Sequence, residues 1–510
     1  MKRYLACLCF LFVIACSDDT ESPALDSGGA GGTGGHAGED DASIPMNDAA
    51  AQPDDSGIST GAPDAMTSEP VIGEPGCGFP HAAFCDTFDA PAAHRGRAGE
   101  LDVRRWSEGH VQGELPTAPG FAFGIRPATL PLCRADLPAQ VYPGQDALVC
   151  DPTPEVPSPH LLLACGAQNY GMTSLRIRQP FDFAERTGTI SFDADGNVIN
   201  PLLGWISVAV TEDPTAVPSY AILGNDEGGV LPRNAFEMHF ARNCPDNMSM
   251  GPRMIALYDD RIETIVGFPD DAPCVSVKEG HLNHFEIKVS KSRIEVFTSP
   301  YSEDGTSFGP LSSMISADVD LPFTRGYVTI AVHNHATIKY SGGDSAYSEK
   351  LYDAWSARWD NVGFDGPVLD NYREYEIPDG TGTIEDRVNV AHLVADDMMG
   401  PSDVFTFRDV DLTGVTSARI AQTTYYLLDG MEDDNLLRYR INGHDWHDRP
   451  PDASERQAWT HNSHGTLAQI LEVPLAELQS GDNTIEYVTR DVPQSYPPAV
   501  LNIDLVLATD

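Results

Sequence analysis

The chain has 510 residues, and its 76 Asp and Glu residues against 32 Lys and Arg residues give a formal net charge of −44 at pH 7. A chain this acidic lacks the basic surface that nucleic acid requires, and no nucleic-acid partner is expected. The same charge argues against an anionic polysaccharide held in a basic groove. The length is sufficient for two or three domains.

The N-terminus has the organisation of an export signal. Met1-Lys2-Arg3 is followed by an apolar run, up to Ala15, that is too short to span a bilayer. The run ends in Ala15-Cys16 and resembles a bacterial lipobox, in which the Cys becomes the acylated first residue of a lipoprotein. The resemblance implies that residues 1–16 are a lipoprotein signal peptide with lipidation at Cys16. The exported protein is then lipid-anchored to the bacterial outer membrane or cell surface, its only membrane contact. An ordinary signal peptide with a chance Cys is the alternative.

Residues 17–75 contain no Lys or Arg and are rich in Asp, Gly, Ala, Ser and Pro. Such a segment cannot bury enough apolar surface to fold. We expect a disordered acidic linker that holds the folded part away from the membrane.

The sequence from residue 76 to about residue 370 predicts an all-β domain. Short strand patterns recur there between Gly, Pro and Asp residues, with almost no helical periodicity. The predicted strands are Ala83–Phe88, Ser174–Asp182, Gly188–Ala194, Leu203–Thr211, Ala235–Arg242, Met254–Tyr258, Asn283–Val289, Arg293–Thr298, Gly326–Tyr340 and Ala357–Phe364. A long series of antiparallel strands indicates a two-sheet β-sandwich.

The cysteines after the signal peptide lie only in this first domain, and an exported chain favours disulfides. Two pairs each lie between neighbouring predicted strands, and we expect these to be bonded: Cys77 with Cys85, and Cys244 with Cys274. The third bond is expected between two of Cys133, Cys150 and Cys165. There is no CxxC motif, and a zinc cluster is not expected.

Four motifs occur in an order that resembles the concanavalin A-like lectin/glucanase superfamily. They are F-C-D-T-F-D at 84–89 followed by Trp106, T-G-T-I-S-F-D at 187–193, H-F-E-I-K-V at 284–289 and W-D-N-V-G-F at 359–364. The resemblance implies a jelly-roll β-sandwich over residues 76–370 whose first and last strands lie side by side. The segment Ala357–Val368 is then the closing strand of the domain.

Three predicted strands each have one apolar face and one face with Trp, Glu or His. If these polar faces line one concave sheet, they form a groove for a sugar, because indole stacks on sugar rings and carboxylate and imidazole bind hydroxyls. The candidate ligand-binding residues are Trp205, Glu237, His239, His333 and His335. Solvated histidines with no ligand, or a metal held by the histidines, are the alternatives.

Catalysis by the glucanase mechanism is not expected. Laminarinase-like members of the superfamily carry E-x-D-x-(x)-E on one concave strand, whereas this chain has Glu237-Met238-His239-Phe240-Ala241. A retaining hydrolase needs two carboxyl groups about 5–5.5 Å apart, and the second acid is missing here. A hydrolase or lyase that uses Glu237 and His239 stays open as an alternative.

The resemblance also implies a structural Ca²⁺, since calcium often joins the first and last strands in this superfamily. Asp86 or Asp89, together with Asp360, occupy suitable positions. These carboxylates could instead cap turns or pair with Arg358.

A second all-β unit is expected over residues 383–510, after a polar connector at 371–382. An Asn442-Gly443 turn is followed by V-P-L-x-x-L-x-x-G-x-N-x-I at 473–485. This combination resembles galactose-binding-like jelly-roll modules attached to carbohydrate-active enzymes. Trp446 and Trp459 lie in His-rich loops and are candidate sugar platforms, unless they close the ends of the core.

The sequence therefore predicts an all-β surface lipoprotein with two β-sandwich domains that binds carbohydrate or a glycoprotein without catalysis. The first alternative is a carbohydrate-active enzyme, either a polysaccharide hydrolase or a lyase. The second is a structural or interaction protein of the cell envelope with no sugar ligand.

Overall fold

The structure is a computed structural model, and it describes the chain from residue 71 to residue 509 with gaps. The described ranges are 71–111, 128–129, 133–134, 140–141, 147–154, 156–165, 172–195, 204–215, 234–241, 249–257, 262–266, 275–276, 281–299, 308–334, 355–377, 392–393, 395–396, 403–425, 437–450, 466–489 and 499–509. The predicted signal peptide, Cys16, residues 17–70 of the predicted linker, Cys244, Cys274, His335 and Trp459 lie outside these ranges. The end of the predicted linker is ordered, since Val71–Ile72 forms a strand that pairs with Pro367–Val368. Residues Ser68–Asp510 form one compact unit. In the described ranges no helix has the length and apolarity needed to cross a membrane.

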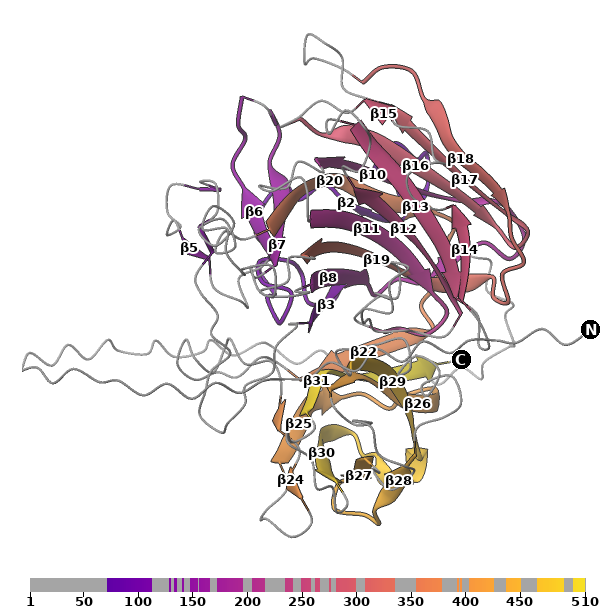
Figure 1. Cartoon of the computed structure of the whole chain (residues 1–510). Coiled ribbons are helices and arrows are strands. Elements are labelled where there is room, and N and C mark those ends of the chain that lie inside the picture. Colours follow the sequence, from indigo (N-terminus) through magenta and orange to yellow (C-terminus); the bar gives the residue numbers. More distant parts are fainter. Residues whose placement is uncertain are drawn as a thin grey trace, which may run out of the picture. The chain divides into compact units, whose positions relative to one another are not determined.

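The described chain is all-β, as predicted, apart from one short 3₁₀ turn (Figure 1). The first sandwich has two antiparallel sheets. Along the eight-stranded sheet run β18 (Ser312–Asp318), β17 (Arg293–Ser299), β16 (Asn283–Ser290), β10 (Gly188–Asp195), β20 (Trp355–Asp365), β7 (His160–Cys165) and β6 (Ala147–Cys150), and β2 (Ala82–Asp86) also pairs with β20. Along the nine-stranded sheet run β14 (Ile262–Val266), β13 (Ser249–Leu257), β12 (Ala235–Ala241), β11 (Gly204–Thr211), β19 (Arg325–Asn334), β8 (Met172–Ile177) and β3 (Trp106–Val111), with β15 (Val275–Ser276) and β9 (Phe181–Asp182) at its margins.

One hydrophobic core fills the space between the two sheets. Alternate residues of β12, such as Phe236 and Phe240, point inward because successive side chains of a strand face opposite sides. Phe240 meets Phe285 of the opposite sheet with ring centroids 4.9 Å apart. Trp106 and Trp359 are both fully buried in this core. Burial of each such large side chain contributes about 2–3 kcal/mol, which accounts for the tight closure of the two sheets.

The first and last strands of this sandwich lie side by side, which confirms Ala357–Phe364 as the closing strand. Phe84 of β2 pairs in register with Phe364 of β20. A register shift occurs on β20 at Asn361, which has a positive φ of 50°. This bulge lets both Trp359 and Phe364 point into the core although they are five residues apart in sequence.

The second sandwich consists of two five-stranded sheets. One sheet contains β22 (Tyr372–Glu376), β31 (Ala499–Thr509), β26 (Val415–Tyr425) and β29 (Thr466–Val473), with β23 (His392–Leu393) on β31. The other contains β24 (Ala395–Asp396), β30 (Gly481–Thr489), β27 (Leu437–Ile441) and β28 (His447–Arg449), with β25 (Asp403–Val410) on β30. A separate core of mostly aliphatic residues, including Ile420, Ile485 and Leu505, lies between them. Two short pairs complete the described strands: β1 (Val71–Ile72) with β21 (Pro367–Val368), and β4 (Ala128–Thr129) with β5 (Gln140–Val141).

Strand β22 lies inside the segment that the sequence predicts as a connector. It pairs with β31 from Tyr372 opposite Ala508 to Glu376 opposite Asp504. The polar sequence Y-R-E-Y-E does not look like a buried strand. It can be one because arginines of the first sandwich neutralise its acidic side chains.

These contacts form a buried ion network between the two sandwiches. Arg97 donates to both carboxylate oxygens of Asp504 at 2.8 Å, and Arg176 contacts Glu374 at 2.5 Å. Burial would raise the pKa of Glu374, but the charges of Arg176 and Arg178 bring it down to about 2. Burial raises the pKa of Asp504 to about 6 against the opposing charge of Arg97. Removal of one charge from this network would leave its partner buried and unpaired.

Candidate functional site

The register of the nine-stranded sheet places four of the predicted ligand-binding residues on one sheet. Trp205 of β11 is opposite His333 of β19, and Ser207 of β11 is opposite His239 of β12. Glu237 is opposite Ala209, two residues further along each strand. All of these alternate with core residues such as Ile206 and Met238, so their positions belong to the face that points away from the core.

Glu237 and His239 contact each other on that face. Nε2 of His239 lies 3.0 Å from Oε1 of Glu237. The side chains are 0% and 1% exposed, so the pair is an internal element of the protein and not an open surface. A buried carboxylate requires such a partner, since an isolated charge would be strongly disfavoured away from water.

The residues that pair with Glu237 across the sheet offer no second carboxylate. Ala209 of β11 and Ile255 of β13 are its register partners, and Thr329 of β19 pairs with Ala209 in the same row. Thus the described part of this face has one acid, Glu237, where a retaining glycosidase needs two.

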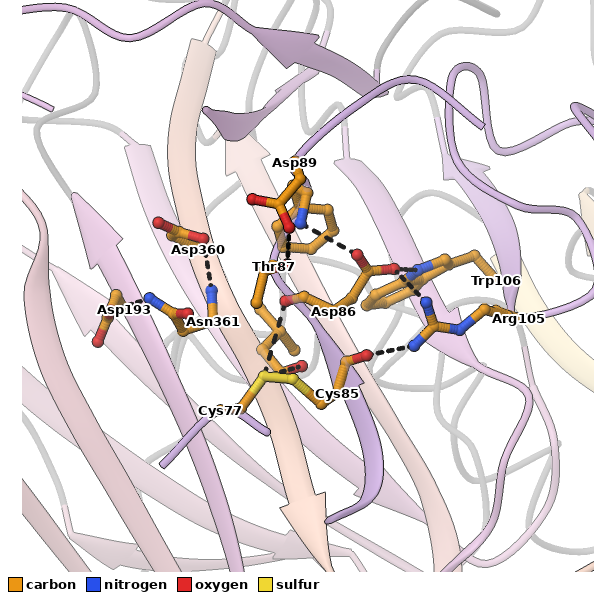
Figure 2. The surroundings of a disulfide bond; sticks show 12 residues. Cys77, Cys85, Asp86, Thr87, Asp89, Arg105, Trp106, Asp193, Asp360 and Asn361 are labelled. Atoms are coloured by element: carbon orange, nitrogen blue, oxygen red, sulfur yellow. Dashed lines mark hydrogen bonds and ion pairs between the residues drawn. A yellow bond between two sulfur atoms is a disulfide. The ribbon is translucent and has the colours of Figure 1, made fainter. Parts of the chain in front are cut away.

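The predicted calcium residue Asp86 has a different role in the structure. Its Oδ2 accepts a hydrogen bond from Nε1 of Trp106 at 2.8 Å and lies 3.3 Å from Nη1 of Arg105, and its Oδ1 accepts from the backbone N–H of Phe88 at 3.1 Å. Figure 2 shows this group beside the Cys77–Cys85 disulfide. With both oxygens engaged, Asp86 fixes the chain after β2 and does not fit a metal ion as it stands.

Asp360 lies on the other side of β20, near Asp193 and Asn361 (Figure 2). It accepts hydrogen bonds from Oγ of Ser158 at 2.7 Å and from the backbone N–H of Asn361 at 2.8 Å. Burial, together with the charges of Asp193 and Asp89, raises the pKa of Asp360 to about 6 against the hydrogen bonds from Ser158 and Asn361. In the part of the chain that the structure describes, no group of three or more His, Cys, Asp or Glu side chains is placed to hold a metal ion. Arg358, the predicted alternative partner, lies 3.9 Å from Asp195 instead.

Two disulfides are present among the described residues. The Cys77–Cys85 bond confirms the prediction, with a Cα–Cα distance of 5.6 Å. The second bond joins Cys133 to Cys150, one of the three pairings that the sequence left open. Cys77 also packs against the closing strand, where Gly363 leaves room for it.

The predicted turn at Asn442-Gly443 is confirmed, and it presents Trp446 at the surface of the second sandwich. Both turn residues have positive φ, 50° and 71°, as a tight hairpin turn requires. Trp446 is half-buried and lies outside the hydrophobic core of the sandwich. It therefore does not close the end of the core.

Two arginines of β27 hold the indole ring of Trp446. The guanidinium carbon of Arg440 lies 4.5 Å from the ring centroid, and that of Arg438 lies 5.5 Å away. Arg438 is itself paired with Asp448 at 2.8 Å, and Arg440 is paired with Glu486. These arginines were not among the predicted site residues, although the alternation L-R-Y-R-I at 437–441 places them together on the polar face of the strand.

Polar side chains surround the indole. His444 and Asp445 are exposed in the same hairpin. Nε2 of His447 lies 2.8 Å from Oε2 of Glu477 and its ring lies 5.2 Å from that of Tyr439. An aromatic ring fixed beside exposed hydrogen-bonding groups is the arrangement that recognises a sugar ring.

Among known proteins, the chain is similar only to solved structures. No protein-family model and no curated protein matches the chain. The structure is similar to the carbohydrate recognition domain of Emp47p, with 12% identity, a TM-score of 0.26 and coverage of 41% of this chain and 84% of that chain. The exoplasmic/lumenal domain of VIP36, in its Ca²⁺/Man3GlcNAc-bound form, matches at 12% identity and a TM-score of 0.28, over 48% of this chain and 88% of that chain. Rv0315 of Mycobacterium tuberculosis, an immunostimulatory antigen and pseudo β-1,3-glucanase, matches at 13% identity and a TM-score of 0.31, over 56% and 98%. At these values none of them assigns a function to this chain.

Proposed function

We propose that this protein binds carbohydrate, or the glycan of a glycosylated partner, without catalysis, through the Trp446 hairpin. The observation that carries the proposal is the half-buried indole of Trp446, which contacts the guanidinium groups of Arg438 and Arg440 and lies outside the core. A partly exposed tryptophan outside the core is suited to stack on the apolar face of a sugar.

The surroundings of Trp446 lower the cost of binding. Arg438 and Arg440 are tied to Asp448 and Glu486, so the indole is already held before a ligand arrives. A preorganised side chain loses less conformational entropy on binding than a free one. The exposed His444 and Asp445 then supply a donor and an acceptor for sugar hydroxyls.

The proposal is non-catalytic because of the residues around Glu237 in the first sandwich. The acid–imidazole pair at the predicted glucanase position, Glu237 with His239, is buried, and its register partners contribute no second carboxylate. We also propose that the protein is a surface lipoprotein anchored at Cys16, supported by the sequence Ala15-Cys16 after an apolar run.

A glycan array followed by calorimetry on the full chain tests the binding proposal. Trp446→Ala should abolish binding of the glycan that the wild-type protein selects, while Trp446→Phe should keep part of the affinity because a ring remains. Phe308→Ala is the matched control, since Phe308 is an aromatic residue 38% exposed in the first sandwich. No binding to any glycan, or equal loss in the control, would contradict the proposal.

A further inference from the structure

A large groove lies away from both sites described above. It has a volume of about 1370 Å³ and is lined by β2, by the segment 95–105, by β22 and by the end of β25. Apolar walls come from residues such as Phe84, Val103 and Tyr375. The volume is larger than that of a typical small-molecule site, so an extended ligand is accommodated.

The groove lining has a higher share of basic residues than the chain as a whole. The lining has six arginines and five carboxylates, whereas the whole chain has 32 basic and 76 acidic residues. The arginines are Arg95, Arg104, Arg105, Arg178, Arg373 and Arg408. They come from segments far apart in the sequence, so only the fold brings them together.

One of these arginines is structural. Arg178 donates to the carbonyl oxygen of Trp106 at 3.2 Å, to that of Glu374 at 2.9 Å and to the carboxylate of Glu376 at 3.1 Å. All three nitrogens of its guanidinium group are thereby engaged.

Other arginines of the groove keep donors for a ligand. Arg408 is exposed and makes no ion pair with any residue in the described part of the chain. Arg104 uses Nε and Nη2 on Asp102, while its side chain stays 66% exposed. Arg373 uses Nη1, which donates to the carbonyl oxygens of Asp411 and Thr413 and lies 3.2 Å from Oδ2 of Asp411.

Arg105 is held in a fixed orientation at the same groove. Its guanidinium carbon lies 4.6 Å from the ring centroid of Phe84, Nη2 donates to the carbonyl oxygen of Cys85, and Nη1 lies 3.3 Å from Oδ2 of Asp86. Cys85 is itself tied to Cys77 by a disulfide. A planar guanidinium group fixed in this way is preorganised for a planar anion.

We propose that this groove binds a short acidic oligosaccharide through carboxylate or sulfate groups. Guanidinium groups form paired, charge-assisted hydrogen bonds with both kinds of anion. The length is restricted because a long polyanion would meet the repulsion of the rest of a chain with a net charge of −44. This site is separate from Trp446, and its arginines distinguish it from the acidic chain as a whole.

Calorimetry with the full chain tests this inference with three probes of equal length. They are a tetrasaccharide of galacturonate, its fully methyl-esterified neutral form, and a sulfated tetrasaccharide. Binding of at least one acidic probe, at least roughly tenfold tighter than the neutral form and weakened by added salt, is the expected result. The tighter of the two acidic probes identifies the anionic group. Equal affinity for the neutral form, or no binding of either acidic probe, would overturn the proposal.

Variants then locate the binding. The double variant Arg104→Ser/Arg408→Ser should lose about tenfold in affinity for the acidic probe. Arg293→Ser, an arginine of β17 that pairs with Asp318 outside the groove, and Trp446→Ala should bind it like the wild-type protein. A thermal melt verifies that each variant is folded. If the double variant binds as tightly as the wild type, or if Arg293→Ser loses as much, the groove is not the site.

Discussion

Asn442 and Asn483 join the two sequence motifs of the second sandwich through a direct hydrogen bond. Nδ2 of Asn442 donates to Oδ1 of Asn483 at 2.8 Å, and Oδ1 of Asn442 accepts from the backbone N–H of Thr484 at 2.8 Å. Asn483 is fully buried and also donates to the carbonyl oxygens of Gln479 and Gly481. The N-G turn of the Trp446 hairpin and the G-x-N segment are therefore joined in one hydrogen-bonded network.

Substitutions of Asn442 separate the contribution of its side-chain hydrogen bonds from that of its backbone conformation. Asn442→Gly keeps the positive φ but loses the side-chain hydrogen bonds, and we expect a loss of about 1–3 kcal/mol in the free energy of unfolding. Asn442→Ala adds backbone strain at φ 50° and should lose about 1 kcal/mol more. Urea denaturation measures both. Equal stability of the two variants would show that the backbone conformation contributes nothing.

The sequence alone predicts the local features of this fold well. The closing strand with Trp359 and Phe364, the Cys77–Cys85 bond and the Asn442-Gly443 turn all follow from patterns within a few residues. These patterns reflect alternation of side chains and backbone conformation, which the chain determines locally.

Features that depend on distant partners are not predicted. Strand β22 has the polar sequence Y-R-E-Y-E because Glu374 and Glu376 are neutralised by Arg176 and Arg178 from the other sandwich. Likewise Asp86 is a ligand candidate by sequence, whereas Trp106 and Arg105 occupy its oxygens in space. No pattern within either segment reveals these partners.

Gly363 of the closing strand should not tolerate a side chain. A Cβ atom there would lie 2.7 Å from the carbonyl oxygen of Phe84 and 2.8 Å from Cβ of Cys77. Because one neighbour is backbone and the other is held by a disulfide, neither can move freely. Gly363→Ala should lower the free energy of unfolding by about 1–3 kcal/mol, measured by denaturant titration. An unchanged midpoint would mean that β2 and β20 separate without cost.

We expect substitution of Asp360 by Asn to raise the free energy of unfolding in a pH-dependent way. Its folded-state pKa is about 6, above the ordinary value of 3.8, so its ionised form is disfavoured in the folded protein. The penalty is absent below pH 3.8, grows as the pH rises, and is complete above pH 6. Asp360→Asn, which cannot ionise, should therefore raise the free energy of unfolding by about 2 kcal/mol at pH 8, and the gain should vanish near pH 4.

Calcium provides the control for this prediction. A Ca²⁺ ion held by ionised Asp360 would stabilise the wild-type protein at pH 8 and reverse the order of the two proteins. Thermal melts with calcium or with a chelator measure this. An Asn variant that is less stable than the wild type in both conditions would contradict the destabilising role of the charge.

The buried pair of Arg97 and Asp504 should make the two sandwiches unfold together. Asp504→Asn leaves Arg97, whose side chain is 1% exposed, without a counter-charge, and we expect a loss of about 3–5 kcal/mol. The double variant Arg97→Met/Asp504→Leu removes both charges and should recover most of that loss. The single variants Arg97→Met and Asp504→Leu complete the cycle, and calorimetric melts of the wild type and of all these variants test it. Additive losses in the double variant would show that the two residues do not interact.

The Glu237–His239 pair gives a test that separates structure from catalysis. The pair is buried, so Glu237→Gln leaves the imidazole without its carboxylate and should lower the free energy of unfolding by about 1–3 kcal/mol. Because the pair lies in the first sandwich, glycan binding at Trp446 should keep its affinity in this variant. The wild-type protein should release no reducing ends and no unsaturated products from polysaccharides, since the described face has no second acid for a retaining hydrolase. A cleavage activity that Glu237→Gln or His239→Ala abolishes, in protein that stays folded, would instead make this pair the centre of an enzyme.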